Sequence, residues 1–158
     1  MIDMKTKKLH RLALCFVAIA GLGLLAPSCS DDDNDETSIA FNQLPQNAQS
    51  FILQYFPDAD ITRVEMDRDH EGGYDVYMSD GAKVEFNGAG EWTDVRAANG
   101  SEVPAAIIPQ PIQEYLATHY PDTLVKEISL DARGYEVELN VGLDLDFDPQ
   151  GNFISIDR

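Results

Sequence analysis

The sequence predicts an α+β fold: a tandem α-β-β-β-β repeat that forms one curved antiparallel sheet, with helices packed on one face. Three observations lead to this prediction. Two long segments resemble each other, each begins with a helical apolar pattern, and each continues in short runs that alternate apolar and polar residues. The connections between these runs are too short for the crossovers that parallel strands require, so the strands are antiparallel.

The internal repeat aligns residues 44–66 with residues 108–130, so that Pro57 matches Pro121. Beyond these segments the alignment continues with a shorter offset, because the first copy has three extra residues in the Asp67–Gly73 loop. The later matches are Tyr74 with Tyr135, Val76 with Val137, Gly81 with Gly142, Phe86 with Phe147 and Gly90 with Gly151. A repeat of this length indicates two copies of one supersecondary unit.

Each unit opens with an amphipathic helix. Pro45 and Pro109 suit a first helical turn, and Pro57 and Pro121 end the two helices. Apolar residues recur at helical spacing on one face of each segment. In the first they are Ala48, Phe51, Ile52, Tyr55 and Phe56, and in the second Ile112, Tyr115, Leu116, His119 and Tyr120.

Short alternating runs follow each helix, broken by Gly, Asn and Asp, and they predict strands. The expected strands are 61–67, 73–79, 82–87 and 91–96 in the first unit, and 124–130, 134–140, 143–148 and 152–157 in the second. Period-2 alternation separates two faces. Tyr135, Val137, Leu139, Leu143, Leu145 and Phe147 point to one side, which takes the helices, and the acidic residues between them point to an open face in contact with water.

The first 28 residues read as a secretory signal, with basic residues before the apolar run Leu12–Leu25. A short transmembrane anchor is the alternative, but the run is shorter than a typical span and no basic cluster follows it. Leu25, Ala26 and Ser28 precede Cys29 and resemble a bacterial lipobox, although Pro27 and the early position of Leu25 depart from the strict pattern. The resemblance implies that Cys29 is lipidated, and a cysteine with two or more acyl chains is a stable anchor.

Residues 29–40 are expected to form an acidic, lipid-anchored tether, because like charges repel and extend the chain. The run Ser30–Asp35 resembles the export signal that sends Bacteroidetes lipoproteins to the outer face of the outer membrane. The expected domains are therefore a signal peptide (1–28), the tether, module 1 (41–96), a linker (97–107) and module 2 (108–158).

The formal net charge is −17, with 28 acidic and 11 basic side chains, and the signal peptide contains four of the basic ones. This charge disfavours nucleic acid, whose binding needs basic patches. It favours a basic protein, a cationic peptide or a divalent cation. Cys15 lies in the signal and Cys29 at the lipid, so the folded part has no disulfide.

The motif that runs from LPQNAQSFILQYFPDADITRV to GYDVYMSDGAKVEFNGAGEW, with its second copy, resembles the PepSY-like, beta-lactamase-inhibitor-protein-like domains of Bacteroidetes lipoproteins. The resemblance spans nearly all of residues 40–158. It implies that the concave sheet face grips a partner, partly through aromatic side chains, with helices on the convex side. This chain lacks the disulfides of the inhibitor protein and has an acidic concave face, so a lactamase target does not transfer.

One candidate site is an aromatic set on the open face. Trp92 and Phe153 are equivalent in the two copies, and strand parity relative to Val95 and Ile156 places both on this face with Tyr77. Arg63 and Glu65 complete the predicted partner-binding set. The alternative is a register error of one residue, which would place Trp92 and Phe153 in the core.

A second candidate is an acidic ladder on adjacent strands. Like charges on one face destabilise a sheet, so a cation or a basic partner is expected to offset them. The alternative is a solvated strand face. Asp144-x-Asp146-x-Asp148 resembles a calcium loop, but Gly151 comes too late and Ser155 stands where a bidentate Glu is needed. The possible cation-binding residues are Glu136, Glu138, Asp144, Asp146 and Asp148, with no confirmed metal and calcium as the only cofactor considered.

Catalytic signals are absent from the sequence. His70 lies in a loop and His119 on a helix, neither near a nucleophile motif. The leading hypothesis is a non-catalytic surface lipoprotein that binds an unknown protein or peptide, basic or an enzyme target, in an inhibitor-like manner. A cation-binding or scaffold lipoprotein of the envelope is the alternative. A catalytic domain would require a cleft acid with a large pKa shift.

Overall fold

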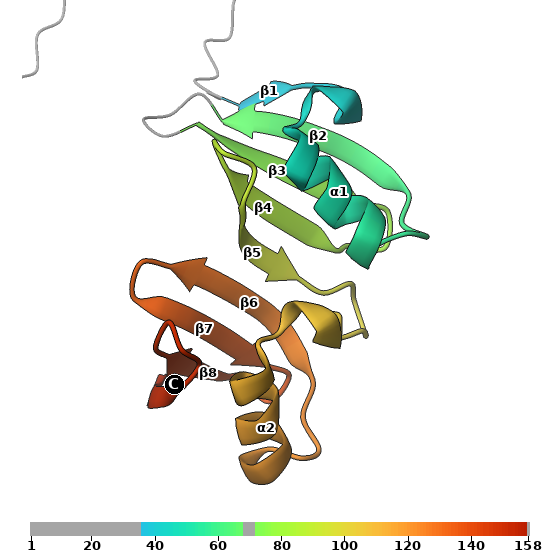
Figure 1. Ribbon diagram of the computed structural model, residues 1–158. Coiled ribbons are helices and arrows are strands. Elements are labelled where there is room, and N and C mark those ends of the chain that lie inside the picture. Colours follow the sequence, from blue (N-terminus) through green and yellow to red (C-terminus); the bar gives the residue numbers. More distant parts are fainter. Residues whose placement is uncertain (1–35, 68–71, 158) are drawn as a thin grey trace, which may run out of the picture. The chain divides into compact units, whose positions relative to one another are not determined.

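The computed structural model describes residues 36–67 and 72–157 (Figure 1). These residues fold as part of one compact unit, Asp33–Arg158. The elements are, in chain order, β1 (Glu36–Ser38), η1 (Phe41–Gln43), α1 (Gln46–Tyr55), β2 (Ile61–Asp67), β3 (Gly73–Met78), β4 (Lys83–Asn87), β5 (Trp92–Arg96), η2 (Ala105–Ile107), α2 (Gln110–His119), β6 (Val125–Asp131), β7 (Gly134–Leu139), β8 (Leu143–Phe147) and β9 (Phe153–Asp157).

All nine strands belong to one antiparallel sheet whose spatial order follows the chain, from β1 to β9. The predicted α+β fold and both sets of four strands are confirmed, with ends that differ by at most one residue. The two modules join edge to edge, because β5 pairs with β6 through Asp94–Ser129, Val95–Ile128 and Arg96–Glu127. The sheet therefore continues without a break from one module into the other.

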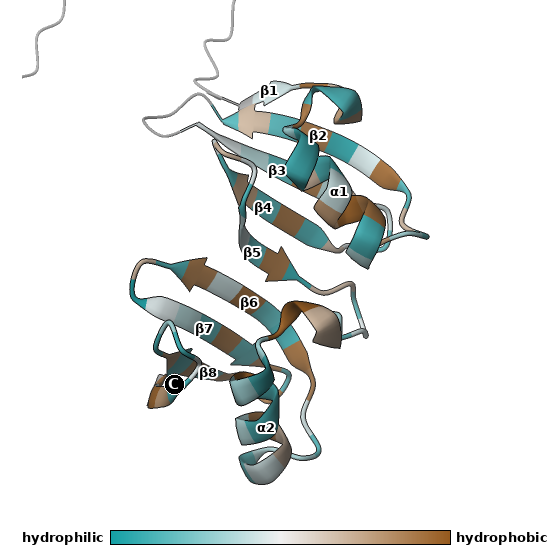
Figure 2. Ribbon diagram, in the orientation of Figure 1, coloured by the Kyte–Doolittle hydropathy of each residue, from teal (hydrophilic) through white to brown (hydrophobic). Residues whose placement is uncertain are grey.

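One face of the sheet forms the core. Neighbouring strands align a row of apolar residues across both modules, and Figure 2 shows the alternation that produces this row. The row is Val64, Val76, Val84, Val95, Ile128, Val137 and Leu145, all buried. The helices cover this row with Ala48 and Ile52 of α1 and Ile112 and Leu116 of α2, as the helical spacing predicts.

Proline sets both ends of each helix. Pro45 and Pro109 are the N-caps, with φ of −52° and −55°, and helices α1 and α2 end directly before Phe56-Pro57 and Tyr120-Pro121. The residue before a proline avoids the α region, so each helix stops there. These features confirm the predicted helix boundaries.

The start of the fold differs from the prediction. Glu36–Ser38, which the sequence assigns to the tether, form β1 and pair with β2. Ile39 also donates its amide to the Val64 carbonyl at 2.9 Å. A strand of three residues gives too short an alternating pattern to be recognised, and its pairing covers the outer edge of β2. Cys29, most of the tether and His70 lie outside the described residues.

Both modules contain β-bulges at equivalent positions. The register shifts between Ile61 and Arg63 and again between Val125 and Glu127, at the start of each module's first strand. In β5, Thr93 is the extra residue, because Glu85 pairs with Asp94 and Phe86 with Trp92. In β9, Ile154 is the extra residue, because Asp146 pairs with Ser155 and Phe147 with Phe153. The extra residue in each strand reverses the side-chain parity on its two sides.

Candidate functional site

The sheet face opposite the helices, here called the open face, carries two rows of side chains that run across both modules. The first row is Arg63, Tyr77, Lys83, Arg96, Glu127, Glu138 and Asp144. The second row is Glu65, Asp75, Glu85, Asp94, Ser129, Glu136, Asp146 and Ser155. Their side chains are exposed or partly exposed, because both helices pack on the other face.

Tyr77 is the aromatic centre of the module 1 half. Its ring lies between two cations, with the Arg63 Cζ 4.0 Å and the Lys83 Nζ 5.1 Å from the ring centroid. Its hydroxyl donates to Asp75 Oδ2 at 3.0 Å. Partial burial and the hydrogen bond to Asp75 raise the pKa of Tyr77, so the phenol stays neutral. The side chain is therefore held in place by the contacts of its ring with both cations and by the hydrogen bond of its hydroxyl.

Lys83 bridges two carboxylates on neighbouring strands. Its Nζ lies 2.8 Å from Asp75 Oδ2 and 2.6 Å from Glu85 Oε1, and only 18% of the side chain is exposed. Burial lowers the pKa of Lys83, but the hydrogen bonds to Asp75 and Glu85 outweigh that effect and raise it. The ammonium thus neutralises a cross-strand acid pair that would otherwise repel.

Asp94 and Glu127 are diagonal neighbours where the modules join, because Asp94 pairs with Ser129 and Arg96 pairs with Glu127. Burial raises the pKa of Asp94 to about 7, and the Glu127 charge adds to this effect. The hydrogen bond from Arg96 lowers the pKa of Glu127, so the two carboxyl groups shift in opposite directions. Asp94 Oδ1 and Glu65 Oε2 are buried oxygens without a hydrogen-bond partner. The proton therefore stays on Asp94, which can donate a hydrogen bond to the ionised Glu127.

The module 2 half has the opposite charge balance. The repeat places Glu127, Glu138 and Asp144 at the positions that Arg63, Tyr77 and Lys83 occupy in module 1. Glu136 pairs with Asp146, and Glu138 pairs with Asp144, so four acids lie on two neighbouring strands. The predicted placement of these four on adjacent strands is confirmed, and their binding of a cation stays a prediction.

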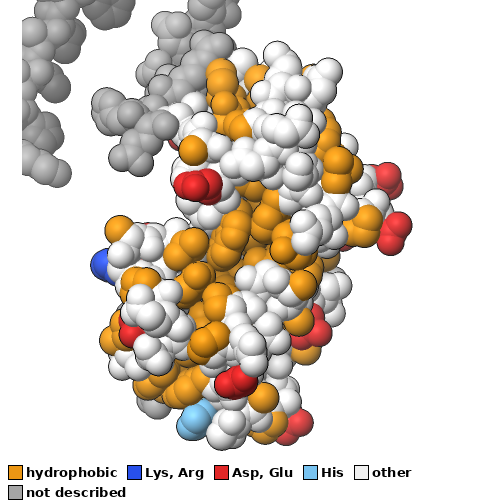
Figure 3. Space-filling model, viewed as in Figure 1, with side chains coloured by type: hydrophobic (Ala, Val, Ile, Leu, Met, Phe, Trp, Pro, Cys, Tyr) orange, Lys and Arg blue, Asp and Glu red, His pale blue; other side chains and the backbone are white. Residues whose placement is uncertain are grey.

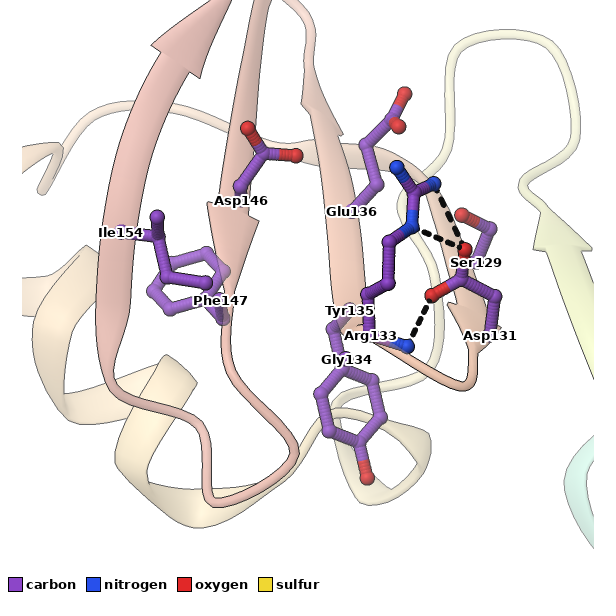
Figure 4. Close-up of a pocket in the computed structure, with 9 residues that line it drawn as sticks. All are labelled: Ser129, Asp131, Arg133, Gly134, Tyr135, Glu136, Asp146, Phe147 and Ile154. Carbon is purple, nitrogen blue, oxygen red and sulfur yellow. Dashed lines mark hydrogen bonds and ion pairs between the residues drawn. The ribbon is translucent and has the colours of Figure 1, made fainter.

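Two shallow pockets lie on this half. One, of about 260 Å³, is lined by Glu136, Asp146 and Ile154 together with residues of the β6–β7 hairpin (Figure 4). The other, of about 340 Å³, is lined almost entirely by acids and Ser129. Arg133 and Asp131 both line the first pocket, and Arg133 Nη2 contacts Asp131 Oδ2 at 2.8 Å. A third pocket, of about 170 Å³, lies in module 1 at the place that corresponds, by the repeat, to the first of these two pockets.

Asp148 is not part of the ladder, which corrects the prediction. It lies directly after β8, where its carboxylate accepts hydrogen bonds from the amides of Gln150 and Asn152 and from the Asn152 side chain. These bonds close the β8–β9 turn and lower the pKa of Asp148. Among the described residues, no three His, Cys, Asp or Glu side chains are grouped so that they could hold a metal ion.

The prediction that Trp92 and Phe153 lie on the open face is wrong. Trp92 packs against Phe51 of α1, with ring centroids 6.3 Å apart, and Phe153 stacks on Tyr115 of α2 at 4.7 Å. The bulges at Thr93 and Ile154 reverse the parity on which the prediction depended. The register alternative is therefore the correct one. Figure 3 views the helix side, where hydrophobic side chains gather between the helices.

Tyr77, Arg63 and Glu65 lie on the open face as predicted. Their ordering partners Lys83, Asp75 and Glu85 are not in the predicted set, although the alternation of β3 and β4 could have placed them there. His119 is the last residue of α2. Its ring stacks on Tyr115, and its Nδ1 lies 2.9 Å from the Tyr115 carbonyl oxygen. Within the described residues, no helix is long and apolar enough to cross a membrane.

Comparisons with known proteins identify relatives of the whole domain. A family model described as "Putative beta-lactamase-inhibitor-like, PepSY-like" matches residues 32–71 and 72–155. A crystal structure described as a "putative periplasmic protein from DUF2874 family" of Bacteroides vulgatus is 42% identical, with a TM-score of 0.76, and covers 80% of this chain and 99% of its own. No curated protein matches.

Two further crystal structures are similar over almost their full length. One, from Bacteroides thetaiotaomicron, is described as a "putative calcium-regulated periplasmic protein"; it is 42% identical, with a TM-score of 0.76, and covers 78% of this chain and 98% of its own. The other, from Bacteroides vulgatus, is described as a periplasmic protein of unknown function; it is 31% identical, with a TM-score of 0.74, and covers 78% and 99%. Nearly all of each of these chains aligns with 78–80% of the present chain.

Proposed function

This chain belongs to the family described as "Putative beta-lactamase-inhibitor-like, PepSY-like", and from that premise we propose that it is a non-catalytic binding protein of the bacterial cell envelope. Its open face holds a protein or peptide partner. An inhibitor-like action on an enzyme is the form of binding that the family description suggests. The relatives described as periplasmic support a place in the envelope.

The observation that carries the proposal is the order of the open face. Tyr77 and Lys83 are each fixed by contacts on several sides, although neither side chain is needed to fill the core. A surface whose long side chains are already ordered loses less conformational entropy when a partner binds. Aromatic and Arg side chains are also the residues enriched in the energetic centres of interfaces.

The two halves of the open face favour different parts of a partner. In module 1, Arg63 pairs with Glu65, and Lys83 pairs with Asp75 and Glu85, so the charges around Tyr77 are largely offset. In module 2, the four acids Glu136, Glu138, Asp144 and Asp146 exceed the nearby cations. A partner that fits both halves presents an uncharged or aromatic patch beside a basic one.

Lipidation at Cys29 places this binding face at the outer membrane, facing the cell exterior. The lipobox-like segment and the acidic run after Cys29 support this location. Cys29→Ser is expected to release the protein into the soluble envelope fraction. Treatment of intact cells with a protease distinguishes a domain that faces the cell exterior from one that faces the periplasm, because only the former is cleaved.

Binding explains the site better than catalysis does. Asp94, an open-face carboxyl whose pKa is raised towards neutrality, lines none of the three pockets described above. Its neighbour in the structure is Glu127, a residue of the module junction. The shift therefore has a structural cause, namely burial at the junction of the modules beside Glu127.

A second candidate function is a response to calcium. The acidic excess of module 2 and the similarity to a protein described as calcium-regulated both favour it. Calcium needs six to eight oxygen ligands, so binding would have to rearrange the face. A calcium-dependent rise in the melting temperature that is lost in Glu138→Gln/Asp144→Asn would support this candidate, and an unchanged melting temperature would exclude it.

Affinity capture tests the proposed function. The bait is the soluble domain, residues 33–158, which corresponds to the crystallised relatives. Tyr77→Ser/Glu138→Lys alters the open face, and Leu53→Lys, at a residue 63% exposed on α1, is the control. We expect an envelope protein that is held by the domain and the control but lost by the open-face variant. Equal capture by all three would contradict open-face binding.

A further inference from the structure

The last strand of the sheet, β9, ends in an edge that no described strand covers. The sheet order terminates at β9, which pairs with β8 on one side alone. At the other end of the sheet, β1 covers β2. Proteins protect exposed edges with Lys, Pro or β-bulges. The sequence of β9, Phe153-Ile154-Ser155-Ile156-Asp157, contains no Lys or Pro, although the strand has a bulge at Ile154.

The internal repeat shows what this edge can accept. β5 is the equivalent of β9 in module 1, and its outer edge pairs with β6 in an antiparallel manner over three residue pairs. The bulge at Thr93 does not prevent this pairing, and β9 carries the same bulge at Ile154. The backbone geometry of β9 therefore matches that of a strand that already has a neighbour on this side.

The side chains of β9 are more exposed than their equivalents in β5, because β9 has no described strand on its outer side. Val95 of β5, which faces Ile128 of β6, is 0% exposed, whereas its equivalent Ile156 is 39% exposed. Ile154 is 58% and Phe153 36% exposed, so β9 presents three apolar side chains at its edge. A strand placed beside β9, with an apolar residue opposite Ile156, would bury this surface as β6 buries Val95.

The acidic residues near this edge favour a basic partner strand over a second copy of the chain. Asp144 and Asp146 lie on the open face of β8, the strand next to β9, and Ser155 donates to Asp146 Oδ2 at 2.6 Å. A second copy of the chain paired through its own β9 would bring two such acidic pairs together, which disfavours a symmetric dimer. A strand with Lys or Arg on its open-face side would instead meet opposite charge, within reach of long side chains.

We propose that β9 is a docking edge for an extended segment of a partner protein, which adds a tenth antiparallel strand. The segment alternates basic residues on the open-face side with apolar residues on the helix side. Backbone hydrogen bonds to β9 give affinity, and the alternation gives specificity, as in other cases of strand addition. This edge is separate from the open-face contacts of Tyr77 and does not depend on them.

The test uses a synthetic peptide, acetyl-Gly-(Lys-Ile)₃-Lys-Gly-amide, and the soluble domain. We expect measurable binding by fluorescence anisotropy that weakens with salt, and at least a tenfold loss with Ile156→Lys. Leu53→Lys, which also adds a lysine at an exposed apolar site, is expected to bind as the unchanged domain does. A peptide of the same composition with its lysines and isoleucines in separate blocks is expected to bind at least tenfold more weakly.

Two backbone-methylated peptides make the test specific for strand addition. One is N-methylated at the lysine amides and the other at the isoleucine amides, and these two sets point to opposite edges of a strand. We expect one to lose binding and the other to keep it. Equal binding by both, or equal binding by the domain and Ile156→Lys, would overturn the proposal and indicate attraction by charge alone. A dimer of the domain that Ile156→Lys dissociates would also overturn it, in favour of a second copy.

Discussion

The guanidinium of Arg96 on β5 makes a two-point contact with the carboxylate of Glu127 on β6, with Nε–Oε2 at 2.5 Å and Nη2–Oε1 at 3.1 Å. This contact crosses the line where the two modules meet, beside a strand pairing of only three residues. Without the cation, Glu127 and Asp94 would be two neighbouring acids at the junction. The ion pair therefore connects electrostatics on the open face to the union of the modules.

Arg96→Gln is expected to lower the free energy of unfolding by about 1 kcal/mol, the upper range for a pair that is partly exposed. Urea unfolding of the soluble domain measures this change. The control is Arg133→Gln, whose contact with Asp131 lies within one exposed hairpin and is expected to leave the unfolding midpoint unchanged. Equal effects of the two substitutions would show that the junction pair has no special weight.

Asp94→Asn is expected to change how stability depends on pH. The raised pKa of Asp94, about 7, favours the protonated form in the folded state. The stabilisation that Asp94 gives the folded state is complete below about pH 4, the pKa of the unfolded state, and is lost as the pH rises through about 7. The unchanged domain should therefore lose about 1 kcal/mol relative to Asp94→Asn between pH 4 and 7. Parallel stability curves across this range would contradict the assignment.

Lys83→Met is expected to destabilise the domain by about 2 kcal/mol, because it leaves Asp75 and Glu85 facing each other in a partly buried position. The double variant Lys83→Met/Asp75→Asn removes the repulsion and should recover part of this loss. Denaturant unfolding of both variants and of Asp75→Asn alone completes a double-mutant cycle. A double variant less stable than Lys83→Met would refute the acid-pair explanation.

Gly134→Ala should be the most disruptive glycine substitution in module 2. Gly134 has φ of +138°, and an added Cβ would lie 2.0 Å from the Phe147 carbonyl oxygen of β8. We expect a loss of more than 2 kcal/mol, or failure to fold. Gly142→Ala has a positive φ of +73° but no atom within 4 Å of its Cβ, so it should cost about 1 kcal/mol. Thermal melts compare the two, and a similar cost for both would contradict the close approach at Gly134.

Trp92→Ala and Tyr77→Ser separate stability from binding. Trp92 packs on the helix face, so its truncation should cost about 2–3 kcal/mol and impair binding only through loss of folded protein. Tyr77 lies on the open face, so its substitution should reduce partner capture at temperatures where the variant remains fully folded. If Trp92→Ala remained stable but lost capture, the helix face would be the binding surface.

Strand periodicity was sufficient to predict the sheet and the open face of module 2. Glu136 and Asp146 alternate with apolar neighbours in β7 and β8, so their pairing could be derived from the sequence. The same rule failed for Trp92 and Phe153, because a bulge adds one residue without a sequence signal such as glycine. A single extra residue was enough to move both rings to the other face.

Contacts between distant segments were harder to predict. The pairing of Arg96 with Glu127 depends on how β5 and β6 align across an irregular linker, which composition does not specify. The position of Lys83 between Asp75 and Glu85 depends on side-chain direction as well as strand parity. β1 was missed because three residues are too few for a periodic pattern.

Carboxylate footprinting of the captured complex tests open-face binding most directly. Carbodiimide labelling, read by mass spectrometry, compares Glu138 on the open face with Glu114, an exposed residue of α2 on the opposite side. The account predicts that the partner protects Glu138 and leaves Glu114 reactive. Protection of Glu114 with Glu138 unchanged would contradict it and place the partner on the helices.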